Sequence, residues 1–573
     1  MKSTQINRQL KSIEYLKKFL ITTIILYISV KITSTFWIPI YGTSDDWIID
    51  SWLNSNNTGE YENESVFISG IFSNLISYLY SWEFGISWYS IILVLVSSFS
   101  LVHWFVISTL EKSLNNSKIH NFINISILIP LFLWSYYLIT FTATALLAAI
   151  VGIYSVSKSV TSADLKKLNF IVGNLLLLCA YVIRPESLIG ATAVFAATLF
   201  IIFLTNKKEV RSLVKKIIII IIFLGSVIAV NKYIENNQSL EMKQFRSWVM
   251  KVQKFADRPR MIEVRNNLDK ASWSVNQYHL FADMIYFEKK TINENWIDRG
   301  LDATDTYFLS RQIDFERIDN TFSKYYDSTK IFLLLFSFSI LFYIRTYWVL
   351  FNFKQKYNSV IALVTFVGIH FFVGLFMHNV ARVTIPLLFA LFLAITTNWW
   401  ETDIKVDKSN VKVNYTLFSM VVISLILSIF QLHLYKIENN KKVATAIQTK
   451  KFVKENFENK IILYPGRQEF DAFRNPYVYV REDPVANTIM FGNWDTFSPQ
   501  WNKRVEKLGI DANNISDFLL RDDRVLWATQ DFPQATIHIL NFFKENNYGD
   551  FRLNLLSELP NGARLRYLSS LEK

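Results

Sequence analysis

The apolar residues of this 573-residue chain are gathered into long runs that carry almost no charge. A helix crosses roughly 30 Å of hydrocarbon with about 20 apolar residues, because each residue adds about 1.5 Å. Hydrophobic residues make up 51% of the chain and aromatic residues 16%, which excludes a disordered chain and a collagen-like fibre. The runs also exclude an ordinary soluble enzyme, so we expect a chain embedded in a membrane.

Eleven runs are long enough to be predicted as membrane-spanning helices. They are about 18–40, 86–110, 121–139, 141–157, 168–184, 187–205, 216–233, 330–350, 359–377, 382–399 and 413–434. The run from Ile125 to Val156 is too long for one helix, and we divide it near Thr140 into two short helices. The first run is too long for a cleavable signal peptide and no small-residue cleavage site follows it, so we expect a retained span.

The distribution of Lys and Arg predicts how these spans are oriented. With the N-terminus in the cytoplasm, the cytoplasmic segments carry 21 basic residues, whereas the short outer loops carry two, Arg184 and Arg382. The same asymmetry accounts for the net charge of +12 without a nucleic-acid partner. Anionic membrane lipid would attract the basic cytoplasmic face.

The segments between the spans define the expected fold class, a polytopic α-helical membrane protein with about eleven transmembrane helices. Residues 1–233 would hold spans one to seven and a first outer loop, 41–85. Residues 234–328 would form an outer, mainly helical segment, 329–435 would hold spans eight to eleven, and 436–573 would form an outer α/β domain. In that last domain, 460–464 and 477–480 are strand-like, and 448–457 and 536–546 are amphipathic.

The first outer loop contains a candidate interfacial helix. Its apolar residues recur at helical spacing, with small and polar residues between them: Phe67, Ile68, Ile71, Phe72, Leu75, Ile76 and Leu79. Such a helix would lie in the membrane interface instead of crossing the membrane.

Two adjacent carboxylates, Asp45 and Asp46, follow the first span directly. At the mouth of a helix bundle, such a pair could supply a general base together with a metal ligand or an orienting partner. The alternative is a solvated acidic loop or a helix N-cap, since Ser44 and Asp45 are good cap residues. The only cysteine, Cys179, lies in an apolar run, so any metal would be held by oxygen ligands or His.

Two outer turns carry the candidate phosphate-binding residues. Arg184-Pro185-Glu186 follows the fifth span, and His378 to Arg382 joins the ninth and tenth. The forked guanidinium of Arg matches two phosphate oxygens. Alternatively, Arg184 and Glu186 form a pair that only ends a hairpin. His103 and His370 lie within predicted spans, where a hydrogen-bonded packing role is the expected one.

These features together resemble the membrane-embedded GT-C-type glycosyltransferases. The shared architecture is eleven spans, a large first outer loop with an Asp-Asp pair after the first helix, an interfacial helix behind it, and a soluble outer C-terminal domain. The resemblance extends over nearly the whole chain, but its residue-level motif is Asp45-Asp46 alone. Arg184 and Arg382 match by position.

The resemblance implies an enzyme that uses a polyprenyl-phosphate-linked sugar. Asp45 or Asp46 would deprotonate an acceptor hydroxyl of a glycan, lipid or protein, while Arg184, Arg382 and His378 hold the departing phosphate, so that the sugar is transferred with inversion. The chain lacks the later Asp-x-Asp of the metal-dependent members, since Asp302 and Asp305 are only loosely placed. A divalent cation on Asp45 or Asp46 therefore stays open.

Three further residues are candidate acceptor or sugar contacts: Glu186, Trp273 and Tyr278. The segment 273–283 is similar to stretches in multi-span proteins of bacterial envelopes, which indicates a cell-surface polysaccharide context in the bacterial cell membrane. Aromatic rings stack well on sugars, but Trp273 and Tyr278 could equally pack a helical domain. The same choice applies to Trp494 and Asp495 in the C-terminal segment.

Three other functions remain open at the level of the sequence. A polymerase or ligase would move a whole oligosaccharide from a lipid carrier, and would need a longer acceptor groove. A lipid-glycan transporter or flippase would show inverted repeats and broken helices in mid-membrane, and the sequence shows neither. A scaffold without catalysis would tolerate the loss of both Asp45 and Asp46.

Overall fold

The computed structural model describes most of the chain, and it is mostly helical with a small sheet near the C-terminus. The described residues are 2–35, 37–55, 61–110, 118–161, 165–193, 207–256, 264–265, 267–285, 288–289, 291–303, 330–345, 356, 359–368, 380–396, 415–465, 475–479, 487–492, 495–512, 515–529 and 533–571.

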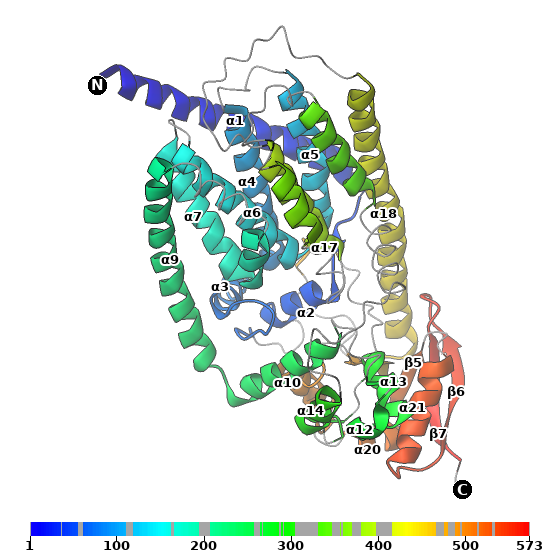
Figure 1. The fold of residues 1–573 in the computed structure, drawn as a ribbon. Coiled ribbons are helices and arrows are strands. Elements are labelled where there is room, and N and C mark those ends of the chain that lie inside the picture. The colour runs from blue at the N-terminus through cyan, green and yellow to red at the C-terminus, as the bar shows by residue number, and fades with distance from the viewer. Residues whose placement is uncertain are drawn as a thin grey trace.

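Long apolar helices form a bundle that occupies most of the molecule (Figure 1). They are α1 (Lys2–Ser34), α4 (Trp88–Leu110), α5 (Lys118–Tyr137), α6 (Phe141–Thr161), α7 (Lys166–Ile183), α9 (Lys207–Asn236), α17 (Ala381–Thr396) and α18 (Tyr415–Asn456). Within the described ranges, six of them are long and apolar enough to cross a membrane: α4, α5, α6, α7, α9 and α18. The structure therefore supports a polytopic helical membrane protein, and the count of eleven spans stays a prediction.

The expected division of the long apolar run near Thr140 is confirmed. Helix α5 ends at Tyr137 and α6 begins at Phe141, with the two-residue strand β2 (Leu138–Ile139) between them. This strand pairs in parallel with β1 (Ile40–Tyr41), which follows α1. A side chain on Gly42 would lie 2.2 Å from the Thr140 side chain, so glycine allows the two turns to touch.

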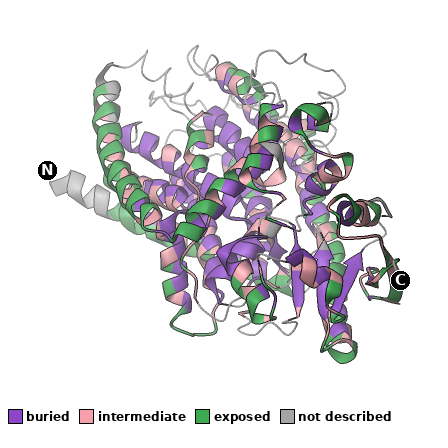
Figure 2. Cartoon of the chain, turned by 90° about the horizontal axis from the view of Figure 1, so that it is seen from below, coloured by how far each residue is buried: buried purple, intermediate pink, exposed green. Residues whose placement is uncertain are grey.

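Helix α6 lies at the centre of the bundle, where 94% of its membrane-length window is buried. It packs on α7 through two glycines. A Cβ on Gly173 would lie 3.0 Å from the Gly152 carbonyl oxygen and 2.9 Å from the Val156 side chain. Small residues let two helix backbones approach closely, and dispersion contacts then hold them together in lipid. Figure 2 shows the buried residues concentrated inside the bundle and along the sheet.

The helix predicted in the first outer loop is present as α3 (Gly70–Tyr80), and its location in the membrane interface stays a prediction. Its N-cap is Ser69, whose side-chain oxygen accepts from the Phe72 amide. Phe72, Ile76 and Tyr80 are buried on one face. Helix α3 and the short helix α2 (Ser44–Leu53) lie at the same end of the bundle, which we call the domain end (Figure 1).

The predicted helical segment after the seventh span also lies at the domain end (Figure 1). It contains α10 (Leu240–Ala256), α12 (Leu268–Ala271), α13 (Val275–Ala282) and α14 (Glu294–Asp302). Residues 304–328 of the predicted segment lie outside the described residues.

The C-terminal α/β domain contains one five-stranded sheet. Its strands are β3 (Ile461–Pro465), β4 (Thr488–Phe491), β5 (Val525–Thr529), β6 (Phe551–Glu558) and β7 (Arg564–Ser570), in the spatial order β4-β3-β5-β7-β6. Strand β3 runs parallel to β4 and β5, whereas β7 is antiparallel to β5 and β6. Helices α19 (Pro499–Lys507), α20 (Ile515–Arg521) and α21 (Pro533–Glu545) complete the domain.

Two details of this domain differ from the sequence-based expectation. The strand expected at 477–480 is only an isolated bridge between Val478 and Ile86, because this segment crosses the start of α4 and does not join the sheet. Residues 448–457 are not a separate helix. They end the 42-residue helix α18, which continues through the boundary expected at 435.

The domain end is held together by one continuous apolar core. Its members include Trp52 of α2, Phe72 of α3, Trp248 of α10, Trp296 of α14 and Trp527 of β5. The Trp52 indole N–H donates to a carboxylate oxygen of Asp495 at 2.7 Å, and both residues are buried. The C-terminal domain therefore packs directly on the helix that carries the Asp45–Asp46 pair.

Candidate active site

The Asp45–Asp46 pair lies in the first turn of α2. The N-cap is Thr43, whose hydroxyl oxygen accepts from the Asp46 amide at 3.4 Å. Carboxylates in a first turn are favoured by the positive end of the helix dipole. The capping residue is therefore Thr43, not Ser44 or Asp45 as the alternative supposed, and the carboxylate pair follows it in the first turn.

Asp46 is fully buried, and protein groups take up both of its carboxylate oxygens. Oδ1 accepts from the Tyr89 hydroxyl at 3.0 Å and from the Phe141 amide at 2.7 Å. Oδ2 accepts from the Thr43 hydroxyl at 2.6 Å. The side chain thereby ties α2 to the start of α4 and to the first residue of α6.

Burial also changes the acidity of Asp46. Desolvation raises the pKa of this carboxyl from 3.8 to about 7, although the Thr43 and Phe141 hydrogen bonds and the Arg382 charge act in the opposite direction. A charged carboxylate out of water is costly, and the three donors offset only part of that cost.

Asp45 is the more accessible member of the pair. Its side chain keeps 17% exposure, and its Oδ2 lies 3.9 Å from Nη2 of Arg382 at the start of α17. The Arg382 side chain is 32% exposed. The structure therefore brings one of the two predicted arginines, Arg382, to this carboxylate pair from more than 330 residues away in the sequence.

Arg184 contacts the start of α6, beside the residue whose amide binds Asp46. It is the C-cap of α7, and its Nη1 donates to the Thr142 hydroxyl. The guanidinium lies 5.0 Å from the centre of the Phe141 ring, and the Phe141 amide binds Asp46. One residue of α6 thus contacts both the candidate cation and the buried carboxylate.

A third carboxylate in α2 was not singled out by the sequence analysis. Asp50 is buried, and it accepts from the hydroxyls of Tyr41 and Tyr80, each at 2.5 Å. Asp46 and Asp50 are four residues apart, which places them on one face of a helix. That spacing was the available signal in the sequence. Asp50 fixes β1 and α3 against α2.

Glu186, a predicted acceptor contact, lies at the edge of this site. Glu186 pairs with Arg184 at 3.7 Å and is 70% exposed, as the hairpin alternative expected. His378 and His370 lie outside the described residues. His103 is buried and its Nδ1 lies 2.6 Å from the Tyr15 hydroxyl, which is the expected packing role.

Trp273 and Tyr278 pack inside the protein instead of lining this site. Trp273 stacks on Trp296 with ring centres 3.7 Å apart and donates to the Trp296 carbonyl. Tyr278 is also in the core of the domain end. The packing alternative therefore holds for both. Asp495 accepts from Trp52, and Trp494 lies outside the described residues.

Within the described part of the chain, no three His, Cys, Asp or Glu side chains come together as a ligand set for a metal ion. Asp302 ends α14, and Asp305 lies outside the described residues. No protein-family model, curated protein or solved structure matches the chain.

The geometry defines a site with one accessible carboxylate, one buried carboxylate and two guanidinium groups at one end of an apolar bundle. An accessible carboxylate can take a proton from a hydroxyl, and guanidinium groups can neutralise a phosphate leaving group.

Proposed function

We propose that this protein is an integral-membrane glycosyltransferase that moves a sugar from a polyprenyl-phosphate donor to a glycan, lipid or protein acceptor. The observation that carries the proposal is the contact between Asp45 and Arg382 beside the buried Asp46. A base for the acceptor and a cation for the leaving phosphate are then within one side-chain length of each other.

The two carboxylates take different roles in this proposal. Asp45 is the catalytic base, because it keeps exposure and its partner is a cation that a phosphate can attract. Asp46 is a positioning residue, since its oxygens already bind Tyr89, Phe141 and Thr43. Removing Asp45 should therefore affect transfer far more than replacing Asp46 by an isosteric amide.

The transfer step balances with these groups alone. The acceptor oxygen attacks the anomeric carbon of the sugar and loses its proton to Asp45. The bond between that carbon and the phosphate oxygen breaks, and its electron pair stays on the phosphate. Attack from the face opposite the leaving group inverts the anomeric carbon. Arg382 and Arg184 stabilise the growing phosphate charge.

Donor binding also prepares the base. At 3.9 Å, the Asp45–Arg382 pair is long for an ion pair, and both side chains are partly exposed. Such pairs contribute roughly 0–1 kcal/mol, so the singly charged phosphodiester of the donor can compete for the guanidinium, and it gains a second negative charge as it leaves. Donor binding would then weaken the contact between Asp45 and Arg382.

We place the site on the non-cytoplasmic face of a bacterial cell membrane, with the N-terminus in the cytoplasm. The support is the excess of Lys and Arg at the segments predicted to be cytoplasmic, and the location of α2, α3 and the C-terminal domain at one end of the bundle.

The test uses the full-length protein in nanodiscs with a hexosyl polyprenyl phosphate and a membrane extract as acceptor source. Release of polyprenyl phosphate is followed for the wild type, Asp45→Asn and Asp302→Asn. We expect acceptor-dependent release by the wild type and by Asp302→Asn, whose carboxylate ends α14. Asp45→Asn should be slower by about 10²–10⁴-fold, the usual contribution of a general base. Equal rates for Asp45→Asn and the wild type would reject the proposal.

A further inference from the structure

The segment 475–479 lies between β3 and β4 in the sequence, but it contacts the helix bundle instead of the sheet. Its path begins with a turn at Asn475-Pro476, two residue types that favour turns. The Asn475 carbonyl accepts from the Val478 amide at 3.1 Å, and the Asn475 side chain accepts from the Tyr477 amide at 3.0 Å. We call this segment of the C-terminal domain the tyrosine arm.

Tyr477 of the tyrosine arm contacts the end of α5. Its hydroxyl donates to the Tyr136 carbonyl at 2.8 Å, and its ring centre lies 5.1 Å from that of Tyr136. Helix α5 ends at Tyr137, and the last four carbonyls of a helix have no partner within that helix. The Tyr477 hydroxyl therefore caps α5 from a distant part of the chain.

The chain that leaves this capped end leads directly to Asp46. Strand β2 follows Tyr137, and the Ile139 carbonyl in this strand accepts from the Gly42 amide at 2.8 Å. Phe141 comes two residues later and donates its amide to Asp46 at 2.7 Å. The position of the Phe141 amide is therefore tied to the end of α5 through a short connection.

The middle of the tyrosine arm contacts the chain just before α4. Val478 pairs with Ile86 in an isolated antiparallel bridge. The Ile86 carbonyl accepts from the amide of Trp88, the first residue of α4. The next residue, Tyr89, donates its hydroxyl to Asp46 at 3.0 Å. The arm therefore also contacts the start of the second element that donates to Asp46.

Tyr479 of the tyrosine arm contacts the end of α3. Its ring stacks on that of Tyr80, with ring centres 5.7 Å apart and an angle of 22° between the rings. The Tyr80 hydroxyl donates to Asp50 at 2.5 Å and accepts from the Tyr89 amide at 3.3 Å. Tyr80 therefore connects the arm to the other buried carboxylate of α2 and to α4.

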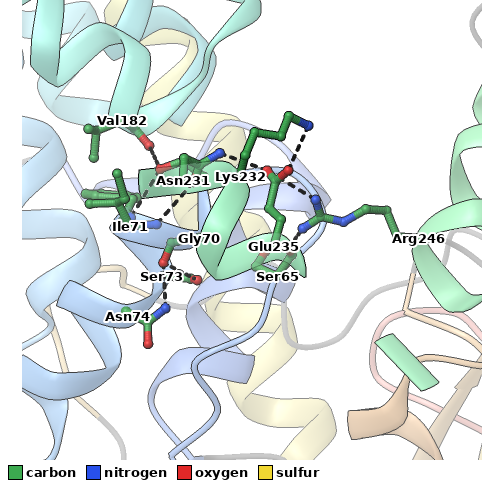
Figure 3. A network of polar contacts seen from close by, with 12 residues as sticks. Ser65, Gly70, Ile71, Ser73, Asn74, Val182, Asn231, Lys232, Glu235 and Arg246 are labelled. Carbon is green, nitrogen blue, oxygen red and sulfur yellow. Dashed lines mark hydrogen bonds and ion pairs between the residues drawn. The ribbon is translucent and has the colours of Figure 1, made fainter. Parts of the chain in front are cut away.

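The opposite end of α3 is attached to α7 and α9 (Figure 3). The Ser69 hydroxyl donates to the Val182 carbonyl, and the Asn231 side chain accepts from the Ile71 amide at 3.4 Å. Asn231 also donates to Glu235 at 2.8 Å. Helix α3 is therefore held by the bundle at its first turn and by the tyrosine arm at its last turn.

Three consecutive residues of the C-terminal domain thus contact the elements that lead to the donors of Asp46 and Asp50. We propose that Tyr477 and Tyr479 are positioning residues, through which the C-terminal domain sets the geometry of the carboxylates of α2. The inference rests on the proposed function for its effect on transfer, whereas its effect on Asp46 does not depend on that function.

The titration of Asp46 reports this geometry directly. The hydrogen bond from the Phe141 amide lowers the pKa of Asp46 and so offsets part of the effect of burial, which raises this pKa to about 7. Displacing the Phe141 amide weakens the hydrogen bond to the charged carboxylate, so the pKa should rise further.

Infrared difference spectra of the full-length protein in nanodiscs, recorded while the pH is raised, test the inference without a transfer reaction. The carboxyl band that is missing in Asp46→Asn reports the titration of Asp46. Tyr477→Phe loses the capping hydroxyl, and Tyr479→Leu loses the stack on α3. Tyr567→Phe is the matched control, because Tyr567 of β7 is 44% exposed. Thermal unfolding of each variant checks the fold.

We expect the midpoint of the Asp46 titration to rise by at least about 0.5 pH unit in Tyr477→Phe and Tyr479→Leu, and to stay at the wild-type value in Tyr567→Phe. In the transfer assay, both arm variants should lower kcat by about fivefold through misplaced carboxylates. The KM for the donor should stay unchanged, because the arginines proposed to bind it lie on other elements.

Wild-type midpoints and kcat values in both folded arm variants would overturn the inference, even if their unfolding temperatures fall, because that result indicates a purely structural role. A shift in one variant alone would assign the positioning to that residue and overturn it for the other. A wild type without transfer activity would reject the proposed function, and the Asp46 midpoints would then decide the positioning role by themselves.

Discussion

Helices α6 and α9 are both long and apolar enough to cross a membrane, yet 94% of the membrane-length window is buried in α6 and only 6% in α9. The buried helix carries Phe141 and Thr142, which contact Asp46 and Arg184. The exposed helix carries no contact to the Asp45–Asp46 pair among the described residues. The comparison teaches that the candidate site is built on a close-packed helix, whereas α9 is only lightly packed against the rest of the protein.

The largest expected effect concerns two glycines, Gly173 of α7 where it packs on α6, and Gly225 of α9. A side chain at Gly173 of α7 would collide with α6 backbone at 3.0 Å, whereas nothing lies within 4 Å of a Cβ at Gly225 of α9. Gly173→Leu should destabilise the protein by about 3 kcal/mol or more, and Gly225→Leu should be neutral or slightly stabilising. Thermal unfolding in detergent measures both. Similar losses in the two variants would show that α9 is packed as tightly as α6.

The next effect concerns Arg382, which we propose to bind the phosphate of the donor. Arg382→Ala removes the cation beside Asp45 and should lower kcat/KM for the lipid-linked donor by about 100-fold, as is typical when one preorganised donor is lost. Arg345→Ala, an exposed arginine at the end of a described helix, is the control and should retain the wild-type rate. Unchanged donor kinetics in Arg382→Ala would show that Arg382 does not bind the donor phosphate.

The pH dependence of stability reports on Asp46. In the folded protein burial raises the pKa of this carboxyl to about 7, whereas in the unfolded chain it loses its proton near 3.8. The folded state therefore binds more protons between about pH 4 and pH 7, and the free energy of unfolding falls as the pH rises through that window. The total is on the order of 2–4 kcal/mol.

Asp46→Asn removes this titration and keeps acceptors for the Tyr89 and Phe141 donors. Unfolding midpoints at pH 5 and pH 8 should therefore differ less in Asp46→Asn than in the wild type. The same difference in both proteins would mean that Asp46 stays ionised in the folded state.

The smallest effect concerns the attachment of α9. Lys216→Met loses the contacts to Ser159 and should cost about 1 kcal/mol, because the lost groups are hydrogen bonds near the helix end. Lys215→Met changes the exposed neighbour and should cost less than about 0.5 kcal/mol. A shift of the unfolding midpoint for Lys216→Met alone would support the attachment. Equal midpoints would show that α9 is held elsewhere.

Much of the fold could be predicted because apolar run length and helical periodicity are local signals. They placed the break near Thr140, the helix at Gly70–Tyr80 and the strand after residue 460. The length of α18 could not be predicted, because its second half is polar and reads as a separate amphipathic helix. The prediction of a strand at 477–480 was wrong, because Val478 pairs with Ile86, which is not in the sheet.

Part of the candidate site could also be predicted from local signals in the sequence. Charges at the edges of apolar runs are rare enough to identify Asp45, Arg184 and Arg382. Which carboxylate is buried depends on tertiary contacts that no local pattern encodes, such as the Phe141 amide reaching Asp46. The same holds for Trp273, which lies between α12 and α13 and stacks on Trp296 of α14.

The proposed roles are Asp45 as the catalytic base and Asp46 as a positioning residue. They are tested most directly by comparing the transfer rates of Asp45→Asn and Asp46→Asn at one pH in the same nanodiscs. The account predicts that Asp46→Asn stays within about tenfold of the wild type, since an amide can preserve its anchoring contacts, while Asp45→Asn loses at least about 100-fold. A full rate in Asp45→Asn together with an inactive, folded Asp46→Asn would contradict it.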